Sequence, residues 1–110
     1  FLAIVFVGGF GALMYENDER INNLISDFLD EKKLVCAICI APRILINANV
    51  LENKKFTMWN QDESQNNFIK NSGGIFTGKN VESDDNIITA NGPMSAKEFG
   101  EIIISKLKEF

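Results

Sequence analysis

The sequence contains no histidine among its 110 residues, and only two cysteines and two prolines. Without histidine, the chain cannot form the Ser-His or Cys-His pairs in which an imidazole serves as general base. Cys36 and Cys39 have C-x-x-C spacing, but zinc would require two more ligands, and no histidine or third cysteine supplies them. We therefore expect no metal site and no cofactor. Two free thiols are more typical of a reducing cytoplasm than of a disulfide scaffold.

The sequence also has fewer basic than acidic residues. The 11 lysines and arginines are outnumbered by 15 acidic residues, which gives a net charge of −4 and a pI near 4.8. Nucleic-acid backbones are bound by basic surfaces, so we expect no nucleic-acid partner. The apolar run from Phe1 to Val7 is too short to span a bilayer and has no basic region before it. Neither a membrane helix nor a signal peptide is indicated.

The residues that are present describe one folded domain, with 45% hydrophobic and 24% charged side chains. The uninterrupted run from Phe1 to Val7 is rich in Ile, Val and Phe, which predicts a central strand buried on both faces of a parallel sheet. Because a domain seldom begins inside its own core, we expect that residues upstream of Phe1 have been removed or lie on another chain, and that further strands flank this one.

Strand and helix patterns alternate along the chain. An apolar stripe predicts a helix over residues 17–30, capped by Asn17 or Asp18, and the run Leu34 to Ile38 predicts a second central strand. Ser95 and Glu98 have the spacing of a capping box before a final helix. Further helices are expected over residues 40–48 and 61–71, and shorter strands over 55–58, 75–76, 81–82 and 86–90. This alternation indicates an α/β sandwich with a mostly parallel sheet.

The most informative segment is L-V-C-A-I-C-I-A-P-R-I-L, which begins at Leu34. A buried strand, a single cysteine and then a helix with Pro42 in its first turn is the arrangement of a nucleophile elbow. There the Cys39 thiol would face a helix N-terminus, which stabilises a thiolate, and Arg43 could add positive potential. The alternative is that Cys39 is a buried core thiol, as free cysteines commonly are. Cys36 lies inside the strand and is expected to be core packing.

A second candidate feature is the Gly8-Gly9 pair directly after the first strand. The carboxyl ends of neighbouring parallel strands meet at one edge of the sheet, so this loop is expected to face Cys39. The backbone N–H groups of Gly9 and Ile40 would then form an oxyanion hole. The competing interpretation is an ordinary turn, since most loops that follow strands use glycine.

Four motifs in order give the chain a wider resemblance: F-V-G-G after a strand, A-I-C-I-A-P at the elbow, V-L-E-N-K-K-F-T after it, and I-I-T-A-N-G-P before the last helix. Together they resemble the ThiJ/PfpI family, which includes the parkinsonism-associated deglycase. The resemblance implies a three-layer, flavodoxin-like fold of the class I glutamine amidotransferase-like type. It also implies that residues 1–110 are the C-terminal portion of one such domain, lacking about two βα units of its N-terminal part.

The resemblance further implies that Cys39 is the reactive cysteine, that Gly9 and Ile40 supply oxyanion-hole amides, and that Gly92 and Pro93 lie near the pocket or a dimer partner. A homodimer or higher oligomer, or association with the missing N-terminal segment, is expected on the same ground. The family's acidic partner for the thiol would lie in that segment.

This sequence departs from the family pattern at three positions. Peptidase-like members place a histidine where Ile40 stands and an acid where Leu13 stands, and deglycase-like members have a histidine near the position of Trp59. Trp59 could wall the pocket, or it could be an ordinary packing residue. Glu16, Asp18 and Glu19 are interpreted as a solvated helix start.

Two functions follow as expectations. The first is a cysteine-dependent enzyme in which Cys39 attacks a small carbonyl or acyl electrophile, as in a glyoxalase, deglycase or hydrolase. The alternative is a non-enzymatic, redox-responsive or chaperone-like protein that uses oxidation of Cys39. Peptidase activity ranks last, because it needs a general base and the chain has no histidine.

Overall fold

A computed structural model describes all 110 residues as one main β-sheet with helices on both faces. The strand order is β1-β2-β6-β5. β1 (Ala3–Phe6), β2 (Leu34–Ile38) and β6 (Ile87–Ala90) are mutually parallel, and β5 (Val81–Asp84) pairs with β6 in the antiparallel sense. The α/β class and the mostly parallel sheet are therefore as the sequence predicts.

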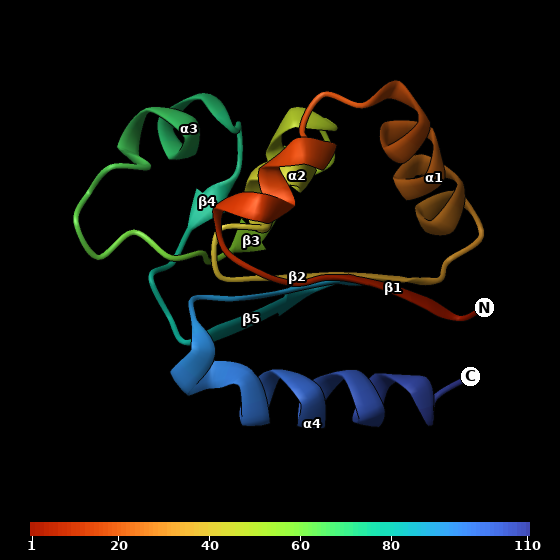
Figure 1. Ribbon diagram of the computed structural model, residues 1–110. Helices are drawn as coiled ribbons and strands as arrows, with labels where there is room; N and C mark the ends of the chain where they lie inside the picture. Colours follow the sequence, from red (N-terminus) through yellow and green to blue (C-terminus); the bar gives the residue numbers. More distant parts are fainter.

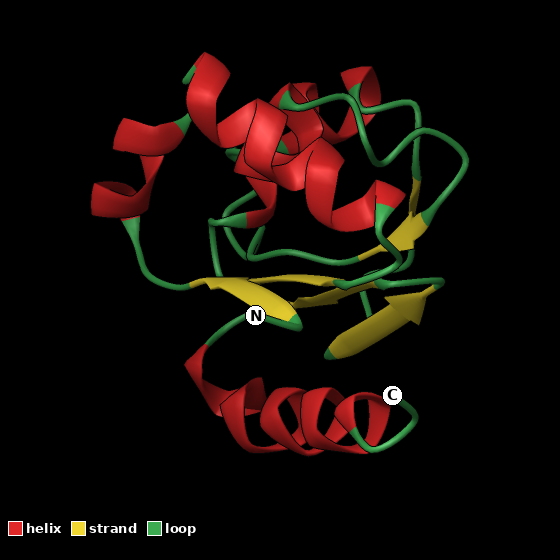
Figure 2. Cartoon of the chain, turned by 90° about the vertical axis from the view of Figure 1, so that its right-hand side faces the viewer, coloured by secondary structure: helices red, strands yellow, loops and turns green.

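The layers are unequal in size (Figure 1). α1 (Glu19–Asp30), α2 (Pro42–Asn47) and the short 3₁₀ helix η1 (Phe10–Tyr15) lie on one face, and α4 (Ala96–Leu107) lies alone on the other. Figure 2, seen from the side, shows the same three-layer arrangement. None of the helices combines the length and the apolar character that a membrane span requires.

A smaller parallel sheet of β3 (Lys55–Phe56) and β4 (Ile75–Phe76) lies beside the main one, with α3 (Asn66–Asn71) between its strands in the chain. A 3₁₀ turn, η2 (Pro93–Ser95), leads into α4. β2 and β4 have the predicted bounds, whereas two helices are shorter than their patterns: α2 begins at Pro42 rather than at residue 40, and α3 begins at Asn66 rather than at residue 61.

The alternation of side chains along the central strand explains the two cores. All five residues of β2 are buried. Val35 and Ala37 point to the side of α1 and α2, whereas Leu34, Cys36 and Ile38 belong to the cluster under α4. Because successive residues of a strand face opposite sides, a strand covered on both sides must be apolar throughout. Cys36 is a fully buried core residue, as expected.

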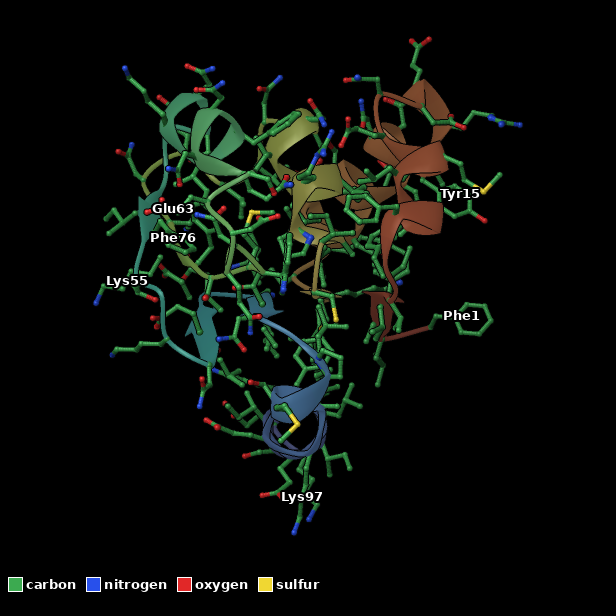
Figure 3. All side chains as sticks on the ribbon, turned by 60° about the vertical axis from the view of Figure 1, so that its left-hand side comes forward. Phe1, Tyr15, Lys55, Glu63, Phe76 and Lys97 are labelled. Atoms are coloured by element: carbon green, nitrogen blue, oxygen red, sulfur yellow. The ribbon has the colours of Figure 1, made fainter.

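The apolar run from Phe1 to Val7 contains a strand, as predicted, but within these residues that strand lies at the edge of the sheet and is not buried on both faces. β1 spans only Ala3–Phe6, pairs with β2 alone, and has a single buried residue, Phe6. Val5 pairs with Cys36 and so points to the side of α4, but α4 packs beneath β2 and β6, and Val5 is 42% exposed. Phe1 extends away from the rest of the molecule (Figure 3). That further strands flank β1 stays a prediction.

Of the two predicted helix N-terminal caps, the one at α1 is confirmed and the one at α4 is wrong. Asp18 caps α1 as expected, and its Oδ1 accepts a hydrogen bond from the Arg20 backbone N–H at 2.9 Å. The capping box at α4 is not formed. The Ser95 hydroxyl instead donates to Asn91 Oδ1 at 2.7 Å, because the preceding 3₁₀ turn directs it backwards.

Gly74, just before β4, is packed closely against β3 and the turn that precedes β3. A Cβ at this position would lie 2.6 Å from the Leu51 carbonyl oxygen and 2.9 Å from the Phe56 ring. We expect Gly74→Ala to lower the free energy of unfolding by about 1–3 kcal/mol, since the backbone carbonyl cannot rotate away as a side chain could. Urea denaturation measures the change.

The matched control for this substitution is Gly100→Ala in α4, where no atom lies within 4 Å of the added Cβ. Alanine is the better helix former, so this variant should be more stable than the native protein by about 0.5–1 kcal/mol. Equal stabilities for the two variants would show that the Leu51 carbonyl and the Phe56 ring do not restrict the side chain at position 74.

Candidate functional site

Cys39 lies at the turn between β2 and α2, with the backbone geometry of an elbow. Its φ angle is +67°, in the left-handed region that non-glycine residues seldom adopt. Hydrogen bonds hold the turn on both sides: the Cys39 N–H donates to the Ala90 carbonyl at 3.0 Å, and the Trp59 N–H donates to the Cys39 carbonyl at 2.9 Å. Six other non-glycine residues of the chain also have a positive φ angle, so at Cys39 it is the angle together with the preceding strand and the following helix that gives the elbow geometry.

The Cys39 side chain opens into a pocket of about 610 Å³ at the carboxyl ends of β1, β2 and β6. This volume is within the usual range of small-molecule sites. The predicted residues Gly8, Gly9, Ile40, Trp59 and Pro93 come together around the cysteine. The remaining lining residues are apolar and come from η1, β2, α4 and the residue that follows β1: Val7, Phe10, Ile38, Ala96 and Phe99. Gly92 does not line the pocket.

Gly9 and Ile40 line the same pocket as Cys39, and their backbone amides have no hydrogen-bond acceptor within the chain. Gly8, with φ at +124°, turns the chain sharply out of β1 and so directs this loop along the edge of the pocket. Unpaired amides next to a nucleophile are the donors that an oxyanion requires.

The charge environment of Cys39 differs from the sequence-based expectation. Burial raises the pKa of the Cys39 thiol above its ordinary value, and no positive group opposes this effect. α2 has only six residues, and Pro42 in its first turn removes one of its free N–H groups. The expectation that the helix N-terminus and Arg43 lower this pKa is therefore wrong for the residues of this chain.

The Arg43 guanidinium forms an ion pair with Glu16 and does not line the pocket. Its Nε and Nη2 atoms each donate to the Glu16 carboxylate at 2.8 Å, and Nη1 reaches Gln65 Oε1 at 3.4 Å. The guanidinium also stacks on the Phe68 ring, 3.6 Å from its centre. The side chains of the pair are only 13% and 15% exposed. Glu16 is thus not part of a solvated helix start, and Arg43 joins η1, α2 and α3 behind the elbow.

No group of three or more Cys, Asp or Glu side chains could hold a metal ion. Cys36 lies outside the pocket, and burial raises its pKa to about 12. Cys39 is therefore the only nucleophilic and the only ionisable side chain that lines the pocket.

The mostly parallel sheet has a central strand that ends in a cysteine on a left-handed turn, and the cysteine opens into a pocket that is also lined by Gly9 and Ile40, whose amides are unpaired. These features define a protein of the cysteine nucleophile-elbow class. The chain belongs to the DJ-1/PfpI family, whose sequence model matches residues 1–106. A solved structure gives the same fold: a ThiJ/PfpI domain protein from Brachyspira murdochii superimposes with a TM-score of 0.90 at 35% identity, over all of this chain and 62% of that one.

Three proteins of similar sequence carry different names. An uncharacterized protein of Methanocaldococcus jannaschii, MJ0967, is 34% identical over 99% of this chain and 53% of its own length. Bacillus subtilis YraA, named as a candidate cysteine protease, is 29% identical over 98% and 62%. Escherichia coli protein/nucleic acid deglycase 2 is 31% identical over 84% and 53%. The chain therefore spans between about half and two thirds of the relatives it matches.

Proposed function

We propose that this protein is a cysteine-dependent enzyme that acts on small carbonyl or acyl compounds through Cys39. The observation that carries the proposal is the position of the thiol, on an elbow turn in a small-molecule pocket that two amides with no acceptor also line. A nucleophile on a fixed turn next to preorganised donors combines attack with stabilisation of the charge that attack creates.

The step begins with loss of the thiol proton. The sulfur then forms a bond to the carbonyl carbon, and the π electron pair moves to the oxygen, where the N–H groups of Gly9 and Ile40 would stabilise it. With a 2-oxoaldehyde, the oxygen takes up a proton to give a hemithioacetal. Proton transfer from C1 to C2 of this adduct would convert it to a 2-hydroxyacyl thioester, and water would hydrolyse the thioester to a 2-hydroxy acid and the free thiol, with no outside oxidant or reductant. With an acyl compound, the leaving group departs and water hydrolyses the resulting thioester.

The proton has no carrier among the residues that line the pocket, because Cys39 is the only ionisable side chain there. Proton transfer in an enzyme of this kind would therefore use water or a group outside these 110 residues. The same observation ranks peptidase chemistry last, since peptide cleavage requires a positioned acid to protonate the leaving amine.

Consumption of a 2-oxoaldehyde such as methylglyoxal tests the proposal. We expect the native protein to consume it, and Cys39→Ser to lower the rate by at least about 100-fold, because the nucleophile is lost. Cys36→Ala is the matched control, since it removes a cysteine that does not reach the pocket, and it should retain activity. Equal rates for native protein and Cys39→Ser would refute the assignment.

The second candidate is a redox-responsive protein. It is favoured by the access that the pocket gives to the Cys39 sulfur, which a peroxide molecule could reach from solvent. Each peroxide molecule transfers one oxygen atom to sulfur and leaves as water, giving a sulfenic and then a sulfinic acid. A gain of two oxygen atoms on Cys39 alone, by mass spectrometry, in a protein that consumes no aldehyde would favour this function.

A further inference from the structure

We infer that the Glu16–Arg43 ion pair is a positioning element of the site, which holds the loop after β1 (residues 7–16) in a fixed place relative to the cysteine elbow. That loop carries the Gly9 amide, and the elbow carries Cys39 and the Ile40 amide. Neither charged side chain lines the pocket, so the pair would act through the backbone and not by contact with the substrate. The inference deepens the proposed function and rests on it.

The pair joins the segments that follow two neighbouring strands. Gly9 and Glu16 flank η1 at its two ends, and Arg43 is the second residue of α2, shortly after Ile40. Because β1 and β2 are parallel, both segments leave the sheet at its carboxyl edge, where the pocket lies and where η1 packs on α2 (Figure 1). Hydrogen bonds between the strands fix where each strand ends, whereas the placement of the two segments beyond them depends on the contacts that these segments make with each other.

Backbone hydrogen bonds connect each charged residue to a residue that lines the pocket. At the start of η1, the Ala12 N–H donates to the Gly9 carbonyl at 3.0 Å, and at its end the Glu16 N–H donates to a carbonyl of the same helix at 2.9 Å. In the elbow, the Arg43 N–H donates to the Ile40 carbonyl at 3.1 Å. A displacement of either charged residue would therefore move a short turn whose other end lies at the pocket.

The contact between the two turns is directional and largely shielded from water. Arg43 donates from Nε and Nη2 to the two oxygens of the Glu16 carboxylate, each at 2.8 Å, and such a two-pronged contact fixes orientation as well as distance. The Phe68 ring and the Gln65 side chain also contact the guanidinium. Because both side chains of the pair are mostly buried, salt and solvent screen their attraction less than they screen a surface pair.

A fixed loop matters for catalysis because amides stabilise an oxyanion only at the right distance, about 2.7–3.1 Å from the oxygen. The Gly9 and Ile40 amides come from different segments, so a relative shift of about 1 Å would weaken one of the two contacts, and a misplacement of that size can cost about 100-fold in rate. Gly8 and Phe10 also line the pocket and belong to the same loop, so the effect is the same whichever of its amides receives the charge. This charge develops only in the transition state, and the pair should therefore affect kcat more than KM.

Steady-state consumption of methylglyoxal by Glu16→Gln and Arg43→Lys is the first test. Both substitutions approximately keep the length of the side chain but lose the two-pronged ion pair. We expect each to lower kcat at least about tenfold and to change KM by less than about twofold. The double variant should be within about twofold of the more impaired single variant, because the two residues act as one unit. Gly74→Ala is the control: it disturbs packing outside the pocket and should keep the native kcat.

The second test does not depend on turnover. NMR relaxation gives the order parameter of the Gly9 N–H, which should be about 0.85 in the native protein, as in other rigid backbone. In Glu16→Gln and in Arg43→Lys it should fall below about 0.6, the range of flexible segments, because the loop loses its contact with the elbow. In Gly74→Ala it should stay at the native value.

The two tests separate the inference from the proposed function. An unchanged Gly9 order parameter in both variants of the pair, or an equal loss of kcat in Gly74→Ala, would overturn the inference and leave the proposed function standing. A mobile loop combined with a native kcat would also overturn the inference. A native protein that consumes no aldehyde, together with a loop that becomes mobile only in the variants of the pair, would instead refute the proposed function and support the positioning of the loop.

Discussion

In the native protein, iodoacetamide should modify Cys39 and leave Cys36 unmodified. Cys39 is partly exposed and opens into the pocket, whereas Cys36 is fully buried under α4 and burial raises its pKa to about 12. Only the thiolate is nucleophilic, and at pH 8 a group with that pKa is ionised in about one molecule in ten thousand. We expect labelling of Cys36 to be at least about 100-fold slower, with peptide mass spectrometry as the measurement.

The pH dependence of this labelling tests the electrostatics of the site. Burial raises the pKa of Cys39, so the thiolate fraction should keep increasing as the pH rises through and beyond the ordinary value of a thiol. Cys39→Ser provides the background. A plateau reached already near pH 6 would contradict this expectation and would require a group outside these residues to stabilise the thiolate. Complete resistance of Cys39 at all pH values would end its assignment as the nucleophile.

Arg43→Ala should cause one of the larger losses of stability available in this chain, about 3 kcal/mol of unfolding free energy. The substitution leaves the Glu16 carboxylate, which is only 15% exposed, without its two hydrogen bonds, and it removes the stacking on Phe68. Arg43→Lys should recover only part of the loss, because an ammonium group cannot reproduce the two-pronged contact or the stacking. Chemical denaturation measures both variants.

The matched control is Arg20→Ala. Arg20 also forms an ion pair, with Asp18 at 3.0 Å, but its side chain is 91% exposed. Surface pairs of this kind contribute little, so this variant should lie within about 1 kcal/mol of the native protein. In a double-mutant cycle, Glu16→Ala and Arg43→Ala should be coupled by about 1–3 kcal/mol. Equal effects of Arg43→Ala and Arg20→Ala would contradict the role given to the Glu16–Arg43 pair.

Local signals in the sequence determined most of the secondary structure and the identity of the central cysteine. The buried run Leu34 to Ile38, the helix that follows it and Pro42 in that helix's first turn are properties of neighbouring residues, and the structure has them where the pattern predicts. The Asp18 cap is equally local. The parallel sheet follows from the alternation of elements, because strands that point the same way need a crossover between them.

Tertiary structure alone decided the charge at the site and the exposure of β1. Arg43 and Glu16 are 27 residues apart, and no periodicity in the sequence relates them. The pattern of Phe1 to Val7 describes a strand that could be buried on both sides, but burial requires neighbours, and α4 packs mainly on β2 and β6, which leaves Val5 partly exposed. In the same way, the pKa of Cys39 depends on how far the fold desolvates the thiol and which charges it places nearby. A sequence motif specifies the residue, whereas the packing around it sets its chemistry.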